Sequence, residues 1–213
     1  YYAGYFVLGA SLFHLFNHAM AKGMLFMASG SVIHEVHHAH DHLHHGSDHG
    51  HHDFDPQDMR NMGGLASKLP VTATAMMFGS MSIIGIPLIG GFWSKEGIIA
   101  KTWSAYFHGE TLMLGPALLI LATAGMTGFY MSRMWFMTFA GEPKSEVVDH
   151  VHESTPWIKE PLIILTIITA VGGFVLAVLG VVDFLSNKSV NLSLHGKPLL
   201  DQIIYELEHA FLP

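Results

Sequence analysis

Cysteine is absent from this chain of 213 residues. Its absence excludes disulfide bonds, thiolate metal sites and iron–sulfur clusters within the chain, because each of these needs cysteine sulfur. Charged residues are also few, at 13% of the sequence, whereas 50% of the residues are hydrophobic. Sparse charges gathered between long apolar stretches are typical of a membrane protein. The net charge of -7 and the scattered basic residues argue against nucleic acid as a partner.

The apolar stretches predict an all-α, polytopic membrane protein. The chain opens as YYAGYFVLG, without an initiator Met or a basic leader, so we expect a fragment of a longer protein that opens inside a hydrophobic helix. Transmembrane segments are expected at residues 1–33, 70–107, 112–139 and 161–182. Loops are expected at residues 34–69 and 140–160, and a polar loop with an amphipathic segment at residues 183–213.

The second expected segment is interrupted by the sequence GIPLIGG at residues 85–91. A proline flanked by glycines leaves backbone amides and carbonyls without helical partners, and lipid cannot satisfy them. Such breaks are tolerated where protein or water lines them. The pattern therefore predicts a discontinuous transmembrane helix beside an ion path.

Three protonatable side chains, His14, His18 and Lys22, follow one another at four-residue spacing in the first expected helix. At this spacing they share one face of the helix and climb about 12 Å along its axis. A lysine near the middle of a bilayer costs about 2.5–3.5 kcal/mol on insertion scales, so it indicates function. Snorkelling or helix-capping side chains are the structural alternative.

Lys95 is a second cation in an apolar setting, directly after the helix break. Its neighbour Glu96 lies about 100° away around the helix, so the two need not pair. Lys95 is a candidate for binding and releasing a proton. It could instead cap the carbonyls that the break sets free.

The segment between the first two helices carries ten histidines from His34 to His52. Such a segment cannot build a core and is expected to be a mobile loop. Imidazoles suit Zn²⁺, Ni²⁺ and Cu²⁺, and His34, Glu35 and His38 form an H-E-x-x-H pattern. Chance alone gives such a match in a tract this rich in histidine. We therefore expect no dedicated metal site, with His34, His37 and His38 as weak candidates, and adventitious metal binding or a metal buffer as alternatives.

Several motifs together resemble the antiporter-like L subunit of respiratory complex I, which is subunit five in mitochondria and is related to the Mrp antiporters. They are, in order, HLFNHAMAKGMLFMASGSVIHE, QDMRNMGGLASKLPVTATAMMFGSMSIIGIPLIGGFWSKEGII, TGFYMSRMWFMTFAGEP and HESTPWIKEPL. The resemblance covers almost all of residues 5–182. It implies a helical bundle in which this fragment forms most of the second of two inverted repeats.

The resemblance also implies a function. His14, His18 and Lys22 match the hydrophilic axis of the family, and Lys95 matches the lysine of its broken helix, followed here by Glu96. The fragment is then expected to move protons in the cell (inner) membrane, beside M- and N-type antiporter-like subunits and small membrane subunits. It is expected to bind no cofactor, with flavin and iron–sulfur clusters on other subunits. The resemblance implies NADH and a quinone as electron donor and acceptor, or a reduced deazaflavin and methanophenazine as in the related methanogen enzyme.

Two functions of other classes remain as alternatives. A stand-alone Na⁺/H⁺ antiporter of the Mrp type would use the same row of protonatable side chains, the ladder of His14, His18 and Lys22. It would also call for carboxylates within the membrane, where Glu96 is the one candidate. A b-type cytochrome needs histidines on two facing helices to hold haem, whereas the deep histidines here lie on one helix.

Overall fold

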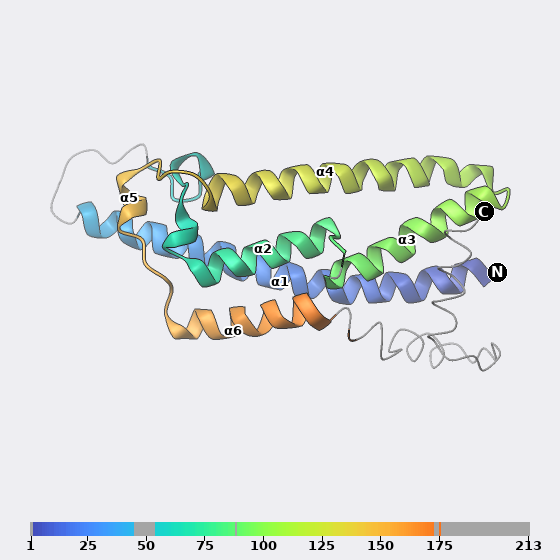
Figure 1. The fold of residues 1–213 in the computed structure, drawn as a ribbon, viewed down its shortest axis with the longest axis horizontal. Coiled ribbons are helices and arrows are strands. Elements are labelled where there is room, and N and C mark those ends of the chain that lie inside the picture. Colours follow the sequence, from blue (N-terminus) through green and yellow to red (C-terminus); the bar gives the residue numbers. More distant parts are fainter. Residues whose placement is uncertain (1, 45–53, 88, 173–174, 176–213) are drawn as a thin grey trace.

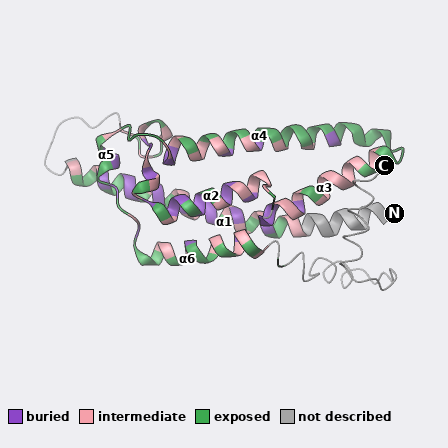
Figure 2. Ribbon diagram, viewed as in Figure 1, coloured by how far each residue is buried: buried purple, intermediate pink, exposed green. Residues whose placement is uncertain are grey.

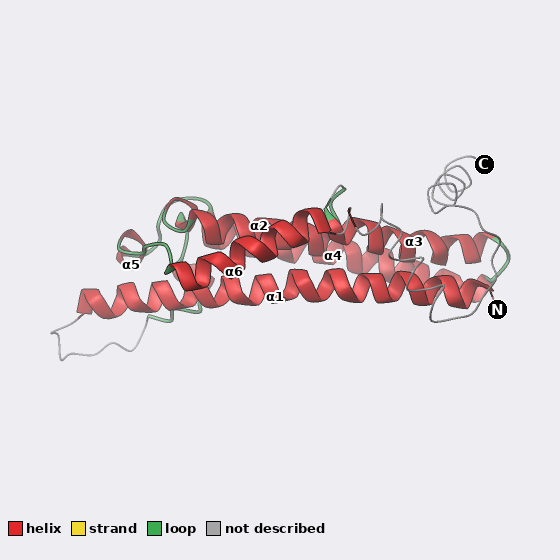
Figure 3. Cartoon of the chain, turned by 90° about the horizontal axis from the view of Figure 1, so that it is seen from below, coloured by secondary structure: helices red, strands yellow, loops and turns green. Residues whose placement is uncertain are grey.

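The protein is described by a computed structural model that places residues 2–44, 54–87, 89–172 and 175. Within these residues the secondary structure is entirely helical. The longer helices are α1 (Tyr2–His44), α2 (Pro70–Ile84), α3 (Gly90–Phe107), α4 (Leu114–Phe139) and α6 (Pro156–Ile167). They run roughly along the long axis of the molecule, and α3 follows α2 end to end (Figures 1 and 3). Short elements are the 3-10 helices Met59–Asn61, Leu65–Ser67 and Thr111–Met113, the helix α5 (Glu146–Asp149) and the π-helix Ile168–Gly172.

The helix α1 is longer than the sequence predicts. It continues through eleven residues of the histidine tract and ends at His44, whereas the sequence predicts a loop from residue 34 onward. Val32, Val36, Ala39 and Leu43 recur at helical spacing on its inner face, and all four pack into the core cluster. Burial of this apolar stripe stabilises the helix, while most of the histidines stand on the other face.

The core lies mainly at the end of the bundle where the C-terminal part of α1 extends past the start of α2, near α5. Leu65, Leu69 and Val148 are fully buried there, together with Phe139 and Leu162. Figure 2 shows this concentration of buried residues around α2, α5 and the adjoining part of α1. The segment 140–160, expected to be a loop, therefore supplies core residues through α5.

The helix α2 ends at Ile84, and α3 begins at Gly90. Gly85 adopts a left-handed conformation with φ of 88°, and the backbone amides of Gly85 and Ile86 both donate to the carbonyl of Met81 at 3.0 Å. The start of α3 then packs tightly against α2, because a Cβ atom on Gly91 would meet the carbonyl oxygen of Ser82. Figure 1 shows α3 leading onward from the end of α2.

One helical segment of the described chain, Thr111–Phe139, is long and apolar enough to cross a membrane by length and composition, with a mean hydropathy of 1.7. The helix Pro70–Ile84 is apolar but shorter. Many large apolar side chains of α4 are exposed, among them Leu119, Met126 and Phe129 (Figure 2).

The last described helix, α6, begins at Pro156, five residues before the expected start at residue 161. Proline is favoured in the first turn of a helix, where its missing N–H has no partner to lose. The π-helix Ile168–Gly172 follows α6 directly. The remainder of the expected fourth segment, apart from residue 175, and the expected amphipathic tail at residues 183–213 lie outside the described residues.

Candidate functional site

The histidines of the ladder lie next to each other on α1. The ring centroids of His14 and His18 are 5.8 Å apart, with the rings tilted by 40°. Lys22 follows one turn later, half-buried, and its charge acts on His18. Their four-residue spacing on one continuous helix produces this row.

His14 is joined to the start of α3 by a hydrogen bond. Its Nδ1 lies 3.0 Å from Oγ of Ser94, a side chain that is only 1% exposed. The Ser94 hydroxyl in turn donates to the carbonyl of Gly91 at 3.1 Å. A hydroxyl has one proton to donate, so with this proton engaged His14 Nδ1 is the donor to Ser94. The Nε2 of neutral His14 is then the nitrogen that can accept a proton.

Lys95, the next residue after Ser94, points from α3 back to the end of α2. Its Nζ donates to the carbonyls of Ile83 and Ile84, each at 3.2 Å. These carbonyls belong to the last turn of α2, where helical partners run out and the helix dipole places partial negative charge. The lysine stem passes over Gly85, since a Cβ atom there would lie 3.2 Å from Lys95 Cδ. The ammonium group is thus held by backbone dipoles.

The first turn of α3 therefore connects two polar elements. Ser94 reaches the ladder on α1, and Lys95 reaches the open end of α2, so the break brings His14 and Lys95 within electrostatic range of each other. Glu96 is exposed and makes no ion pair with a described residue. Of the predicted residues, the structure thus brings His14, His18 and Lys95 together and turns Glu96 away. No direct contact between Lys22 and Lys95 is found in the described chain.

Sequence reasoning missed several buried polar side chains along the same helices. Asn17 Nδ2 on α1, Ser80 Oγ on α2 and Thr169 Oγ1 in the π-helix are buried and have no hydrogen-bond partner among the described residues. Buried polar groups of this kind are usually satisfied by internal water. Asn17 could have been found from the sequence, because it lies between His14 and His18. Ser80 and Thr169 give no such signal, because isolated hydroxyl residues are common in apolar helices.

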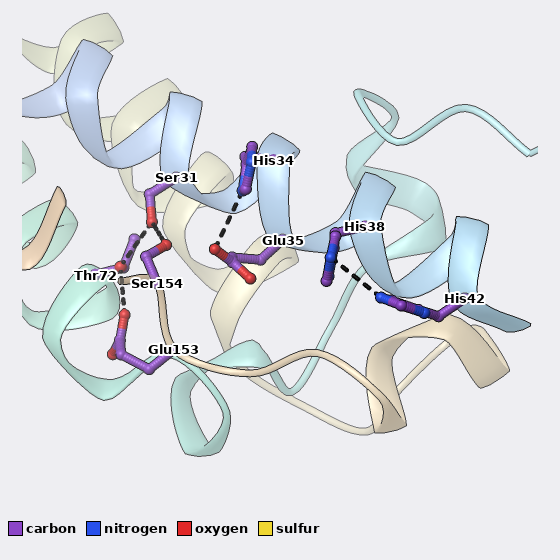
Figure 4. Close-up of polar contacts among 8 residues, drawn as sticks. All are labelled: Ser31, His34, Glu35, His38, His42, Thr72, Glu153 and Ser154. Atoms are coloured by element: carbon purple, nitrogen blue, oxygen red, sulfur yellow. Dashed lines mark hydrogen bonds and ion pairs between the residues drawn. The ribbon is translucent and has the colours of Figure 1, made fainter. Parts of the chain in front are cut away.

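A second buried polar cluster lies near the other end of α2 (Figure 4). Ser31 Oγ lies 2.5 Å from Ser154 Oγ and 3.2 Å from Thr72 Oγ1. Glu153 accepts hydrogen bonds from the Thr72 hydroxyl at 2.9 Å and from the Val71 amide at 2.8 Å. An acidic group at a helix N-terminus accepts from unpaired amides and is favoured by the dipole. Glu153 therefore caps α2 from a distant part of the chain.

The weak metal candidates lie on the exposed face of α1. His37 Nδ1 is 3.2 Å from Asp41 Oδ2. His34 Nδ1 is 3.2 Å from Glu35 Oε1, whereas His38 faces His42 (Figure 4). The described chain holds no group of three or more His, Asp or Glu residues arranged to hold a metal ion. His34, His37 and His38 therefore do not converge on one point.

The family model for "NADH:quinone oxidoreductase/Mrp antiporter, TM" matches residues 2–122. NAD(P)H-quinone oxidoreductase chain 5 of Picosynechococcus is 44% identical over 135 residues, which cover 62% of this chain and 18% of that protein. NADH-quinone oxidoreductase subunit L of Rhodobacter capsulatus is 38% identical over 187 residues, covering 81% of this chain and 23% of that protein. Among solved structures, the Mrp complex from Dietzia sp. DQ12-45-1b superposes with a TM-score of 0.64 at 20% identity, covering 94% of this chain and 39% of that chain.

The chain spans about a quarter, or less, of the length of these curated relatives. Its likeness to the Mrp complex is a likeness of fold. The family match takes in more than half of the chain, and it includes the ladder on α1, the break between α2 and α3, and Lys95. The chain belongs to the NADH:quinone oxidoreductase/Mrp antiporter transmembrane family.

Proposed function

We propose that this chain is the proton-translocating part of a membrane subunit of a complex I-type oxidoreductase, in the cell (inner) membrane. Protons pass along His14, His18 and Lys22, cross ordered water to Lys95, and leave on the other side of the membrane. Glu96, exposed on α3, accepts protons on the outlet side. In this proposal the chain is the second antiporter-like inverted repeat, and α2 and α3 are the two halves of a discontinuous transmembrane helix.

The observation that carries the proposal is the position of Lys95. Its ammonium group rests on the carbonyls of Ile83 and Ile84, while its neighbour Ser94 bonds His14 of the ladder. Backbone carbonyls carry only partial charges, so they hold a lysine without a full counter-charge. A change in the electric field from a neighbouring subunit can then load or unload the lysine. Moving one charge through 100 mV costs about 2.3 kcal/mol, which sets the size of the change that electron transfer must supply.

The redox chemistry lies on other subunits in this proposal. Flavin and iron–sulfur clusters are expected there, since this chain has no cysteine to bind a cluster. Antiporter-like M- and N-type subunits and small membrane subunits are the expected neighbours within the bilayer. NADH with a quinone, or a reduced deazaflavin with methanophenazine, serves as the electron donor and acceptor.

A stand-alone Na⁺/H⁺ antiporter is the second candidate, and the Mrp-like fold is the observation that favours it. Na⁺ is a hard cation that calls for oxygen ligands, as Mg²⁺ and Ca²⁺ do. The lysine and histidines of the site are nitrogen groups, and Glu96 faces away from them. The complex I-type function therefore fits the site better.

Substitution of Lys95 tests the proton path. Arginine keeps a positive charge that can bind the carbonyls of Ile83 and Ile84, but it stays protonated at any accessible pH. We expect Lys95→Arg to reduce proton pumping in membrane vesicles as severely as Lys95→Ala, with assembly retained. Near-normal pumping with arginine and loss with alanine would show that Lys95 is a helix cap and no proton carrier.

A further inference from the structure

A row of imidazoles follows the exposed side of the last three turns of α1. His34, His38 and His42 are four residues apart and therefore lie one above the other. The rings of His34 and His38 are stacked with centroids 6.2 Å apart, and those of His38 and His42 meet edge to face at 4.3 Å (Figure 4). Unlike the ladder of His14 and His18, this row lies on an exposed surface.

Within the row, the nitrogens of His38 and His42 are close enough to bind one ion. Their Nε2 atoms are 3.1 Å apart. Two imidazole nitrogens that bind one tetrahedral Zn²⁺ at about 2.0–2.1 Å lie about 3.3 Å from each other. To bind one ion, the two nitrogens would separate by a few tenths of an ångström, and the two exposed rings would turn so that both lone pairs point at the metal.

The neighbouring side chains favour this pair over the other pairs of the row. His34 is turned toward the carboxylate of Glu35, and Asp41 is engaged by His37 on the adjacent side of the helix. His38 is left facing His42 (Figure 4).

We propose that His38 and His42 form a two-ligand site for a divalent late transition metal ion, namely Zn²⁺, Ni²⁺ or Cu²⁺. Imidazole suits these ions, whereas Mg²⁺ and Ca²⁺ prefer oxygen ligands. For the metal to bind, the proton between the two Nε2 atoms moves to Nδ1 of the ring that donates it, so that both imidazoles bind as neutral ligands through Nε2. Two imidazoles fill only two positions of a tetrahedral ion, so a site of this pair differs from a closed structural zinc site with four protein ligands.

The experiment must separate this pair from the other histidines of the tract. In a background variant, His44, His45, His49, His51 and His52 are replaced by asparagine, which keeps the length of the chain. Zn²⁺ alone is then titrated into the full chain in detergent, and its binding is followed by calorimetry. We expect one ion per chain to bind in this background.

His38→Ala is the test variant in that background, and His37→Ala is its matched control. Both remove one exposed imidazole from neighbouring positions of α1, but only the first breaks the pair. We expect His38→Ala to weaken Zn²⁺ binding by at least about tenfold, and His37→Ala to leave it nearly unchanged. Alanine favours helix, so far-UV circular dichroism should show α1 retained in both variants.

Two outcomes would overturn the proposal. If the background variant binds no Zn²⁺, the metal is held by the histidines beyond the pair. If His37→Ala and His38→Ala weaken binding equally, the tract binds metal collectively and the pair has no special role.

Discussion

The imidazole of His14 and the hydroxyl of Ser94 lie 3.0 Å apart and join α1 to the first turn of α3. This single contact links the two groups of residues that the sequence places eighty positions apart. It also fixes which nitrogen of His14 holds a proton, because Ser94 already donates to Gly91. A proton wire depends on such orientation, so the contact has consequences for transport.

Ser94→Ala removes the acceptor that orients His14. We expect proton pumping per electron to fall several-fold while the protein still assembles, because the loss of one buried hydrogen bond costs about 1 kcal/mol. Ser104→Ala, at an exposed serine of the same helix, is the control and should pump normally. Unchanged pumping in Ser94→Ala would mean that the orientation of His14 does not matter for transport.

Lys22→Ala removes the charge of the ladder residue that follows His18. We expect proton pumping to be lost or strongly lowered, because the proton path loses a protonatable group. Electron transfer should be retained, because the half-buried lysine forms no hydrogen bond to a described residue and its removal should leave the packing intact. Lys144→Ala, an exposed lysine outside the long helices, should have no effect. The ratio of protons to electrons in vesicles is the measurement, and a normal ratio would remove Lys22 from the path.

Gly91→Ala tests the close approach of α3 to α2. The added methyl group would lie 1.9 Å from the Ser82 carbonyl oxygen, so the two helices would have to separate. We expect destabilisation of about 1–3 kcal/mol or more, with a clear drop in melting temperature. Gly23→Ala on α1 meets no atom within 4 Å and should be neutral or stabilising by up to about 1 kcal/mol. Equal melting temperatures for the two variants would contradict the observed packing of the break.

Glu153→Ala tests the cap of α2. The carboxylate accepts from Val71 and Thr72, and its removal leaves the helix start without these partners. We expect a loss of about 0.5–2 kcal/mol in the free energy of unfolding, similar to the loss on removal of an N-cap side chain. Glu142→Ala, an exposed carboxylate in the same segment, is the control. A full loss of pumping without loss of stability would instead indicate that the hydroxyl chain from Ser154 to Glu153 conducts protons.

The helical class is predicted from the sequence, and in the structure α2 ends at Ile84 and α3 begins at Gly90. Proline and glycine act locally, so GIPLIGG indicates the end of a helix without knowledge of its neighbours. The row of His14 and His18 also follows from helical spacing alone. These features need only the nearest residues in the chain.

The sequence did not reveal which partners these residues meet. Ser94 is one of many serines, and only the packing of α3 against α1 makes it the partner of His14. Composition alone predicts a loop for the histidine tract, because polar residues dominate it. In the folded protein, the apolar stripe of Val36, Ala39 and Leu43 packs against the core and stabilises a helix there. In the same way, the burial of α5 depends on tertiary contacts, which its four residues alone do not predict.

The unbroken length of α1 has a consequence for how the protein sits in a bilayer. Its 43 residues correspond to about 65 Å of helix, roughly twice the thickness of the hydrocarbon layer. If Lys22 lies near the middle of that layer, His38 lies about 24 Å farther along the axis, outside the hydrocarbon. The helix would then have one end among lipid tails and the other in water. If it moves as one rigid body, a tilt of the end in water would also tilt the ladder.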